Sequence, residues 1–478
     1  MDISSVIILL YFFITMLVSF LCRHRNTELQ KILVAPQQLG FFLMVPLIFS
    51  GLFGGSTVTG TVSSAFQGGI SSAWYLIGTA IGCFVFLAVA FRFYRAMAVV
   101  KHSASIPDAF SHRFDKKTGL LMVLVIVITN SIALSTIPLS TATIISKITG
   151  MDADATVWIC CAVLIVMALL SGLKGVAAMN IIHTFFMFFG LIVVLIPCLK
   201  TAGGVAGLRS QLPDSYFSLS VNGIGEISAI LLGAVLAIIT SPLAYMTVVS
   251  SDKPRNAKKA LIACAILIIP FTACLVLIGM CCKVIAPELS ANAALFEVAQ
   301  SFSTVCYVFI SMSVLAATFS TAPASLLSII TTLNNDVFCL VKKDATEKEQ
   351  KLFVNIGVIV WTILWIMIGK NAPSILGQLT GATQIKSVAS AVLIISLLWK
   401  RVDSSSGFYA LLVGSVVAMG WHLASNPFGI QPLWPALGIS LLLLVILTLR
   451  NKAPVSDSYS RYESILQEYE ANTEECRR

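Results

Sequence analysis

The sequence contains thirteen apolar stretches between Ile3 and Leu449, each long enough to cross a lipid bilayer. A helix needs about 20 mostly apolar residues to cross roughly 30 Å of hydrocarbon. The mean hydropathy is +0.92, and only 11% of the residues are charged. These values exclude a water-soluble protein and predict an all-α integral membrane protein. The predicted spans are 3–22, 41–66, 72–98, 118–146, 154–172, 175–199, 226–249, 257–282, 302–333, 352–369, 375–399, 405–424 and 431–449.

Basic residues are concentrated in alternate connections between these spans. Of the 31 Lys and Arg residues, 25 lie in the set of connections that includes the C-terminal tail. Positively charged connections stay on the cytoplasmic side of a membrane. The pattern therefore predicts a multi-pass protein of the plasma (cytoplasmic) membrane, with its N-terminus outside and its C-terminus in the cytoplasm. This topology also accounts for the net charge of +9 without a nucleic-acid partner.

The first span could be confused with a signal peptide. Residues 1–3 carry no basic side chain, the Arg23 and Arg25 cluster follows the apolar stretch, and no small-residue cleavage site is present. We therefore expect a retained helix. The twelve cysteines show no metal-ligand spacing, so we expect them to pack as small apolar residues.

Two predicted spans contain residues that interrupt a helix. In the second span, Pro46 precedes the glycine- and hydroxyl-rich segment 50–57, and in the seventh span Thr240-Ser241-Pro242 has the same effect. Non-helical backbone at this depth is stable only where it lines a cavity or is buried in protein. The matching positions of the breaks fit two inverted repeats, roughly 41–199 and 226–399, with ion and solute bound between them.

Five short motifs occur in order along the chain. They are Gly60-x8-Gly69-x4-Trp74, Ser105-Ile106-Pro107-Asp108 with Arg113-Phe114, Ser171-Gly172-Leu173-Lys174, Ala316-Ala317-Thr318-Phe319-Ser320-Thr321, and Ser396-Leu397-Leu398-Trp399-Lys400-Arg401. In these motifs the chain resembles the sodium:solute symporter family of LeuT-like secondary transporters. The resemblance implies a transporter domain over 1–450 with thirteen spans, ten of which form an inverted-repeat core. It also implies uptake of a small organic solute driven by the sodium gradient. The polar tail over 451–478 is expected to be solvated or to lie on the membrane surface.

The sequence offers neutral oxygen ligands for the ion. No Asp or Glu lies in the interior of a predicted span, so a carboxylate proton relay has no residues to use. The family resemblance implies that Na⁺ is coordinated by the carbonyls of Ser50, Phe53 and Ala317 and by the hydroxyls of Ser320 and Thr321. Without the resemblance, these hydroxyls would be expected to bond to their own helix. Na⁺ is then the coupling ion, and no cofactor is expected.

The sixth span departs from the family pattern at two positions. Asn180 stands where the family typically has an aspartate that many members use for a second sodium or for coupling, and His183 replaces a glutamine. We therefore expect one coupled sodium. His183 is expected to be a hydrogen-bonded core residue, and proton coupling through it is the alternative.

Candidate solute contacts lie where the two breaks face each other. A lysine inside an apolar span, such as Lys386, must face a polar cavity or pair with another group, and no acid is available at that depth. We expect Lys386 to receive a substrate carboxylate; the alternatives are that it extends to the membrane surface or occupies a lost ion position. Ala234 and Ile238 stand where proline-transporting members have aromatic residues, which argues against proline. The candidate contacts are Gly54, Gly55, Ser56, Thr57, Gln67, Thr240, Ser241, Tyr245, Gln378, Gln384 and Lys386.

The sequence therefore favours sodium-coupled symport of an amino acid or another carboxylate. Proton-coupled symport and symport of a neutral sugar or polyol are the alternatives. A transporter-like sensor without a kinase domain is a further alternative. Because no kinase or receiver region is expected after Leu449, a partner chain would have to supply it. An intramembrane enzyme would need paired acids or clustered histidines within the spans, and the spans have neither. We expect no enzymatic activity, and the expected partners are the solute, Na⁺ and the lipid bilayer.

Overall fold

The computed structural model describes residues 3–21, 37–135, 137–221, 223–370, 375–451 and 453–475. Within these ranges the chain is helical, apart from turns and one isolated bridge between Leu39 and Ser251. The first helices are α1 (Ile3–Leu21), α3 (Phe41–Leu52), α4 (Gly55–Gly68), α5 (Trp74–Val85), α6 (Phe91–Val100), α7 (Ile106–Arg113), α8 (Lys116–Leu134), α9 (Ile137–Thr149), α10 (Ala153–Thr201) and α11 (Gly204–Gln211). The remaining helices are α12 (Gly223–Ile239), α13 (Pro242–Ser250), α14 (Pro254–Ile285), α15 (Ala291–Phe302), α16 (Thr304–Leu333), η4 (Asn334–Phe338), α17 (Cys339–Val341), α18 (Glu347–Lys370), α19 (Ile375–Leu398), α20 (Ser404–Leu423), α21 (Leu433–Arg450) and α22 (Asp457–Glu475).

Ten helical segments in these ranges are long and apolar enough to cross a membrane. Two further apolar helices, Phe41–Leu52 and Asp154–Leu169, are shorter. The chain is therefore a multi-pass membrane protein, and the total of thirteen spans stays a prediction. The ten segments are Gly55–Val100, Lys116–Leu134, Leu173–Thr201, Gly223–Ser250, Pro254–Ile285, Thr304–Val341, Glu347–Gly369, Thr380–Leu398, Ser404–Leu423 and Leu433–Arg450.

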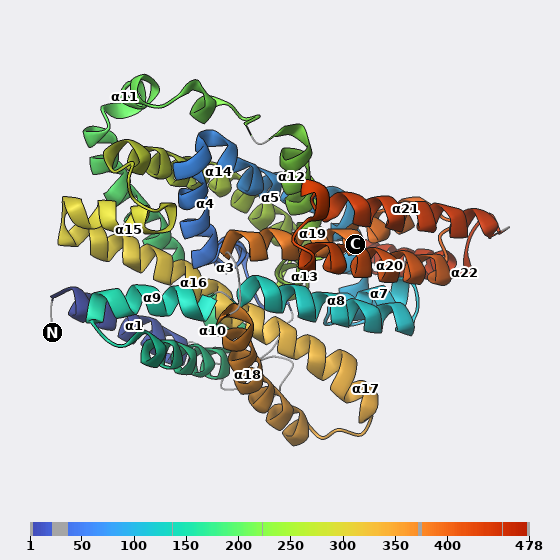
Figure 1. The fold of residues 1–478 in the computed structure, drawn as a ribbon. Coiled ribbons are helices and arrows are strands. Elements are labelled where there is room, and N and C mark those ends of the chain that lie inside the picture. The colour runs from blue at the N-terminus through green and yellow to red at the C-terminus, as the bar shows by residue number, and fades with distance from the viewer. Residues whose placement is uncertain are drawn as a thin grey trace.

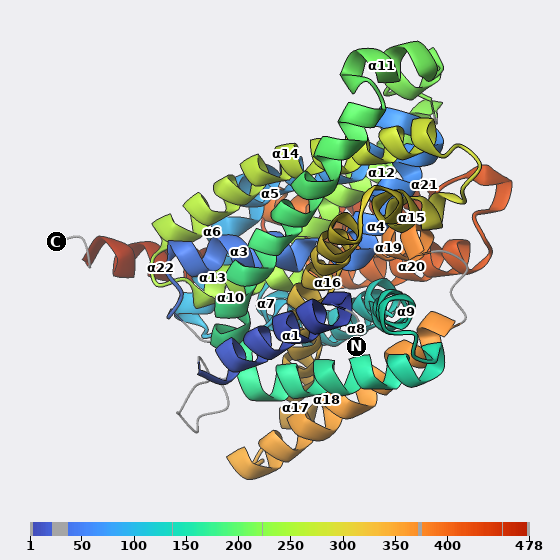
Figure 2. The same cartoon turned by 90° about the vertical axis from the view of Figure 1, so that its left-hand side faces the viewer.

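Two parts of the chain are divided differently from the predicted spans. The span predicted at 118–146 consists of α8 and α9, and Pro138 is the second residue of α9, where a missing backbone N–H costs no helical hydrogen bond. The spans predicted at 154–172 and 175–199 both belong to α10. Figure 2 shows the two parts of α10 running in different directions.

Both predicted breaks coincide with the end of one helix and the start of another. Phe53 and Gly54 have extended backbone between α3 and α4 (φ −120°, ψ 92° and φ −76°, ψ 171°). Ser241 is also extended, and α13 begins at Pro242, a position where proline favours a helix start. A side chain at Gly55 would lie 2.2 Å from the hydroxyl of Thr318, so only glycine allows α4 to approach α16 this closely.

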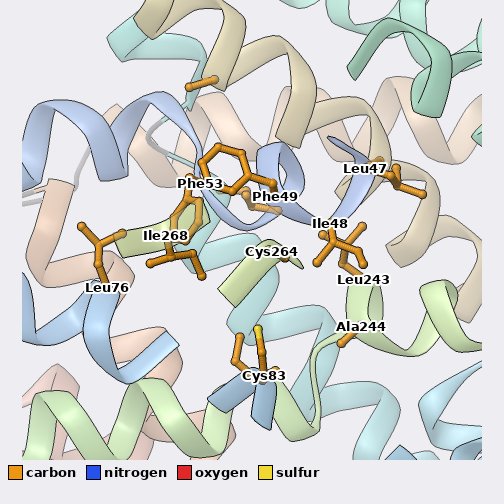
Figure 3. Close-up of a cluster of buried hydrophobic side chains, with 14 of the residues drawn as sticks. Leu47, Ile48, Phe49, Phe53, Leu76, Cys83, Leu243, Ala244, Cys264 and Ile268 are labelled. Carbon is orange, nitrogen blue, oxygen red and sulfur yellow. The ribbon is translucent and has the colours of Figure 1, made fainter. Parts of the chain in front are cut away.

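The side chains of α3 anchor its end in an apolar cluster. Figure 3 shows Phe49 and Phe53 beside Ile268 of α14. The rings of Phe49 and Phe53 both pack on Phe271, with centroids 5.2 and 5.6 Å apart. Because both side chains are buried in this cluster, their packing fixes the position of the backbone at the break.

The C-terminal helix α22 is packed against the bundle. Figure 1 and Figure 2 show α22 and α11 at opposite sides of the molecule. Helix α22 contacts α6 and α7, and Tyr462 and Ile465 are buried there. The sequence predicted a solvated or membrane-surface tail, but the apolar face of α22 packs on protein instead.

Several connections meet at this α22 end of the molecule. Ser105, which begins α7, donates a 2.6 Å hydrogen bond to the carboxylate of Asp336 in η4. Tyr245 of α13 donates to the carbonyl of Ser103 at 2.8 Å. These contacts join η4 to the start of α7, and α13 to the segment just before α7, at the α22 end of the bundle.

Candidate functional site

A cavity of about 120 Å³ lies between the two helix breaks. Residues of the segment 51–57 at the first break and residues 241–243 at the second contribute to its wall. Helices α5, α8, α9, α12, α16 and α19 complete it. The two interrupted helices, far apart in the sequence, therefore enclose one small chamber.

Five of the predicted solute contacts line this cavity. Ser56 and Thr57 come from the first turn of α4, and Gly54 precedes that turn. Ser241 lies at the second break, and Lys386 comes from α19. The lining residues among the candidates are Gly54, Ser56, Thr57, Ser241 and Lys386.

Three other candidates lie away from the cavity. Gln67 is exposed near the far end of α4, more than two turns from the break. Gly55 lies against Thr318 and Val314 of α16 instead. Tyr245 is buried, and its hydroxyl bonds to Ser103 at the α22 end, because α13 directs this position away from the chamber.

Two further candidates are engaged with neighbouring helices. The hydroxyl of Thr240 shares a 2.7 Å hydrogen bond with that of Ser390, so it joins α12 to α19. The amide of Gln384 donates to Gln431 at 3.2 Å. Neither residue lines the cavity. The side chain of Gln378 lies outside the described part of the structure.

Lys386 has no ion-pair or hydrogen-bond partner for its ammonium group in the described part of the chain. It is the only charged residue among the described residues that line the cavity. An isolated charge in a low-dielectric interior is costly unless water or a ligand solvates it. The ammonium of Lys386 therefore needs water or a ligand in the cavity that stabilises its positive charge.

The predicted sodium ligands are close together. The carbonyl of Ser50 accepts hydrogen bonds from Ser320 (3.0 Å) and Thr321 (2.8 Å). The same two hydroxyls bond to the carbonyl of Ala317, at 2.8 and 3.0 Å. Four oxygens from α3 and α16 thus converge, and all four residues are buried.

This oxygen cluster is continuous with the solute cavity. Phe53 and Gly54 form the extended segment next to it, and a side chain at Gly54 would lie 3.6 Å from the hydroxyl of Thr321. Thr321 itself lines the cavity. A hard cation prefers oxygen ligands. If one bound here, it would contact these oxygens directly and take the place of the hydroxyl protons that now form the hydrogen bonds.

Several residues that were not predicted as contacts also line the cavity. The polar ones are Tyr75, Thr79, Thr129, Asn130, Ser325, Ser328 and Thr383. Ser325 and Ser328 follow Thr321 by four and seven positions, which places them on one face of α16. Asn130 is an amide within an apolar helix, and both patterns were readable from the sequence.

His183 and Asn180 lie outside the cavity. The Nδ1 atom of His183 shares a 2.5 Å hydrogen bond with the hydroxyl of Tyr11 in α1. The ring of Phe12 packs on Phe319, next to the predicted sodium ligand Ser320, with centroids 4.8 Å apart. Helix α1 therefore packs beside the predicted ion site. Both amide atoms of Asn180 are buried without a hydrogen-bond partner in the described structure.

A larger cavity of about 830 Å³ lies at the α22 end. Its wall contains both basic and acidic residues, among them Lys101, Asp108 and Lys117. None of the residues of either break lines it. The solute site is therefore assigned to the smaller chamber.

Comparison with known proteins identifies the family. A model of the sodium:solute symporter family matches residues 33–414 of this 478-residue chain. The chain belongs to the sodium:solute symporter family. The resemblance inferred from the five motifs is confirmed.

Relatives of similar length align along nearly the whole chain. The osmoregulated proline transporter OpuE of Bacillus subtilis (strain 168) is 22% identical over 482 residues, covering 94% of this chain and 95% of the relative. The high-affinity proline transporter PutP of the same organism is 23% identical over 490 residues, covering 94% and 99%. The sodium/proline symporter of Escherichia coli (strain K12) is 20% identical, covering 95% and 94%.

Solved structures share the fold. A sodium-coupled sialic acid symporter in a substrate-bound, outward-open state superposes with a TM-score of 0.80 at 16% identity, covering 95% of this chain and 98% of the other. The closed conformation of Mhp1, a nucleobase-cation-symport-1 family transporter, gives 0.61 at 18% identity, covering 90% and 98%. The all-helical membrane fold predicted from the sequence is confirmed.

Family membership and fold together establish the general activity. The protein is a sodium-coupled symporter of a small organic solute, and it is not an enzyme. Na⁺ is its coupling ion rather than a bound cofactor. The predicted sodium coupling is confirmed, and proton coupling or a neutral solute is not favoured.

Proposed function

We propose that the transported solute bears a carboxylate, and that the ammonium group of Lys386 receives it. The observation that carries this proposal is the single charged group in the wall of the chamber, which has no partner in the described structure. A carboxylate accepts charge-assisted hydrogen bonds, which are about twice as strong as neutral ones. Ser56, Thr57 and Ser241 add hydroxyl groups around the same chamber.

The proposed ion site consists of the carbonyls of Ser50, Phe53 and Ala317 with the hydroxyls of Ser320 and Thr321. Thr321 belongs to this site and to the wall of the solute cavity. Ion binding and solute binding therefore share one side chain, which supplies a physical route for coupling. Because Asn180 carries no charge where the family pattern has an aspartate, one sodium ion is coupled per solute.

The proposed topology has two inverted repeats, at roughly 41–199 and 226–399. The connections with most of the basic residues and the tail over 451–478 face the cytoplasm. The N-terminus lies outside, and the protein resides in the plasma membrane within the lipid bilayer. The contact of Ser105 with Asp336 supports this arrangement, because it joins two connections that the charge pattern assigns to one side.

The solute differs from that of the named relatives, which are proline transporters. Ala234 and Ile238 line the cavity at positions where proline-transporting members have aromatic residues. Small aliphatic side chains provide no ring face on which a pyrrolidine could stack. Proline is therefore not the proposed solute.

Uptake into proteoliposomes tests the proposal. Labelled carboxylates and uncharged solutes are offered with and without an inward sodium gradient, to the wild type and to Lys386→Met. Lys283→Met is the matched control, because Lys283 lies near the end of α14 over the ring of Phe66 and away from the cavity. We expect sodium-dependent carboxylate uptake that Lys386→Met lowers at least 100-fold and Lys283→Met leaves within about twofold, since losing one charged contact in a buried site costs about 3 kcal/mol.

Two results would contradict the proposal. One is equal carboxylate uptake by Lys386→Met and the wild type. The other is sodium-dependent uptake of uncharged solutes alone. Binding of ²²Na⁺ by each purified variant serves as a check that the ion site is intact, because Lys386 is not among its ligands.

A further inference from the structure

We propose that the solute is a small monocarboxylate without an ammonium group, such as a two- to four-carbon hydroxy acid, rather than a zwitterionic amino acid. This inference rests on the proposed function, in which Lys386 holds the carboxylate. It goes further by specifying the net charge and the size of the solute. Three properties of the chamber support it: its charge, its free hydrogen-bonding groups and its volume.

The first property is charge. Lys386 contributes one positive charge to the wall, and no acid is present among the described lining residues. The ion site beside Thr321 adds a second positive charge when Na⁺ is bound. An anion reduces this accumulated charge by one, whereas a zwitterion leaves it unchanged and brings its ammonium close to both cations.

The second property is the set of free hydrogen-bonding groups. An ammonium needs acceptors, and backbone carbonyls released by a helix break are the usual neutral source. At the second break, the carbonyl of Ile239 accepts from the hydroxyl of Tyr94 at 2.9 Å. The carbonyl of Ile238 accepts from the backbone N–H of Ser241 at 3.1 Å. Both are therefore already engaged.

Donors, by contrast, are plentiful around the chamber. Helix α4 begins at Gly55 without a side-chain cap, and its first turn lines the cavity through Ser56 and Thr57. The N-terminus of a helix carries a positive partial charge that favours anions. Together with Lys386, this turn supplies a positive field from two directions. Asn130 and Ser328 can bond a hydroxyl or keto oxygen of the solute, since neither side chain has a partner in the described structure.

The third property is volume. The chamber is small, at about 120 Å³. Small apolar residues such as Ala133, Ala234 and Ala237 form part of the wall. This space suits a short carbon chain with one carboxylate and one further polar group.

Matched pairs of solutes test the inference. Glycolate and glycine, lactate and alanine, and 2-hydroxybutyrate and 2-aminobutyrate differ only in a hydroxyl against an ammonium group. Propane-1,2-diol is the uncharged counterpart of lactate. We expect sodium-driven initial uptake of at least one hydroxy acid at least tenfold faster than that of its amino partner, and no uptake of the diol. Lys386→Met should remove the uptake of the acid.

The outcomes separate this inference from the proposed function. Faster uptake of the amino partners, abolished in Lys386→Met, would overturn the inference and leave the carboxylate contact standing. Uptake of the diol at the rate of lactate would overturn both. Failure of every acid in the panel would also overturn the inference, because the inference limits the solute to this class and size.

Charge movement gives a second, independent measurement. The ratio of ²²Na⁺ to labelled solute is determined in the same vesicles in which the transported charge is recorded. For an anion, the charge moved per solute equals the number of sodium ions minus one; for a zwitterion it equals the number of sodium ions. With one sodium per acid, we expect an imposed potassium diffusion potential to change uptake by less than twofold. A charge equal to the sodium count would overturn the inference.

Discussion

The half-buried Lys386 and the buried Arg113 are both cations without an acidic partner in the described structure, yet their surroundings differ completely. The guanidinium of Arg113 donates to the hydroxyl of Ser458 at 3.2 Å and to the carbonyls of Ser396 and Val402. It also lies over the rings of Phe114, Tyr459 and Tyr462, with 4.9 to 5.8 Å to their centroids. The ammonium of Lys386 has no such contact in the described structure and faces a cavity.

The difference separates a structural cation from one that we propose to bind the solute. Arg113 joins α7, the turn between α19 and α20, and α22, so its charge is used to connect three parts of the chain. Burial lowers the pKa of Arg113 to about 10, so the group remains protonated at neutral pH. The side chain of Lys386 bonds to no other group in the described structure, and the stabilisation of its charge is left to water or to a solute.

The largest expected effect on stability follows from Arg113→Met. The substitution removes the buried guanidinium donor from the carbonyl of Ser396 and the hydroxyl of Ser458. The carbonyl of Val402 keeps a 2.8 Å hydrogen bond from the hydroxyl of Ser456. We expect a loss of about 3 kcal/mol in unfolding free energy. Thermal unfolding of the purified protein measures it, and Lys117→Met, an exposed lysine of the neighbouring α8, is the control.

Arg113→Lys sharpens this prediction. A lysine cannot reproduce the planar fork of hydrogen bonds, so we expect only part of the stability to return. For the Arg113→Met protein that remains folded, we expect the same uptake rate as the wild type when the rate is divided by the number of sodium-binding molecules. Lost transport with an unchanged melting temperature would show that Arg113 acts in transport, as proposed for Lys386. That result would contradict the distinction between the two residues.

The next effect concerns the other side of the cavity. In Thr321→Ala one of the four converging oxygens is lost, and we expect the sodium concentration for half-maximal uptake to rise about tenfold, equivalent to ~1.4 kcal/mol. Combining it with Ser320→Ala should abolish sodium-driven accumulation. Thr331→Ala on the same helix is the control, because its hydroxyl bonds only to its own helix, at the carbonyl of Leu327. An unchanged sodium requirement in the double variant would refute the assigned ion site.

Lys386→Met should have the opposite sign from Arg113→Met in a stability measurement. Removing an ammonium that lacks a protein partner relieves its desolvation, so we expect the unfolding free energy to rise by about 1 kcal/mol while transport is lost. Thermal unfolding without solute reveals the change. A decrease similar to that of Arg113→Met would mean that Lys386 is held by the protein after all.

The same pair of residues shows what the sequence could and could not reveal. Lys386 was recognisable because a lysine within an apolar stretch is conspicuous. Arg113 lies in a polar connection, and its burial depends on Ser458, which is 345 positions away along the chain. Sequence patterns report local environment, so a residue buried by a distant helix such as α22 carries no local signal of its burial.

The candidate site shows the same limit. Ser50, Ala317, Ser320 and Thr321, which the family resemblance groups as sodium ligands, lie together in the structure, and their role as ligands stays a prediction. Thr240, Gln384 and Tyr245 were chosen for their polarity at the expected depth, but the rotation of each helix directs them to Ser390, Gln431 and Ser103. Depth in a membrane follows from hydropathy, whereas helix rotation follows from packing between helices.

His183 provides the smallest predicted effect and a third group for the comparison. Its Nδ1 atom is bonded to the hydroxyl of Tyr11, which ties α1 to α10, so His183 resembles Arg113 in having a protein partner. In His183→Gln the amide can keep a hydrogen bond to Tyr11, and we expect the rate of sodium-driven uptake to change less than about threefold. Tyr11→Phe, which removes the same bond from the other side, should have a matching effect. The contrary result would be uptake that a proton gradient drives in the wild type but not in His183→Gln. His183 would then act by binding a proton, as Lys386 is proposed to act by binding the solute.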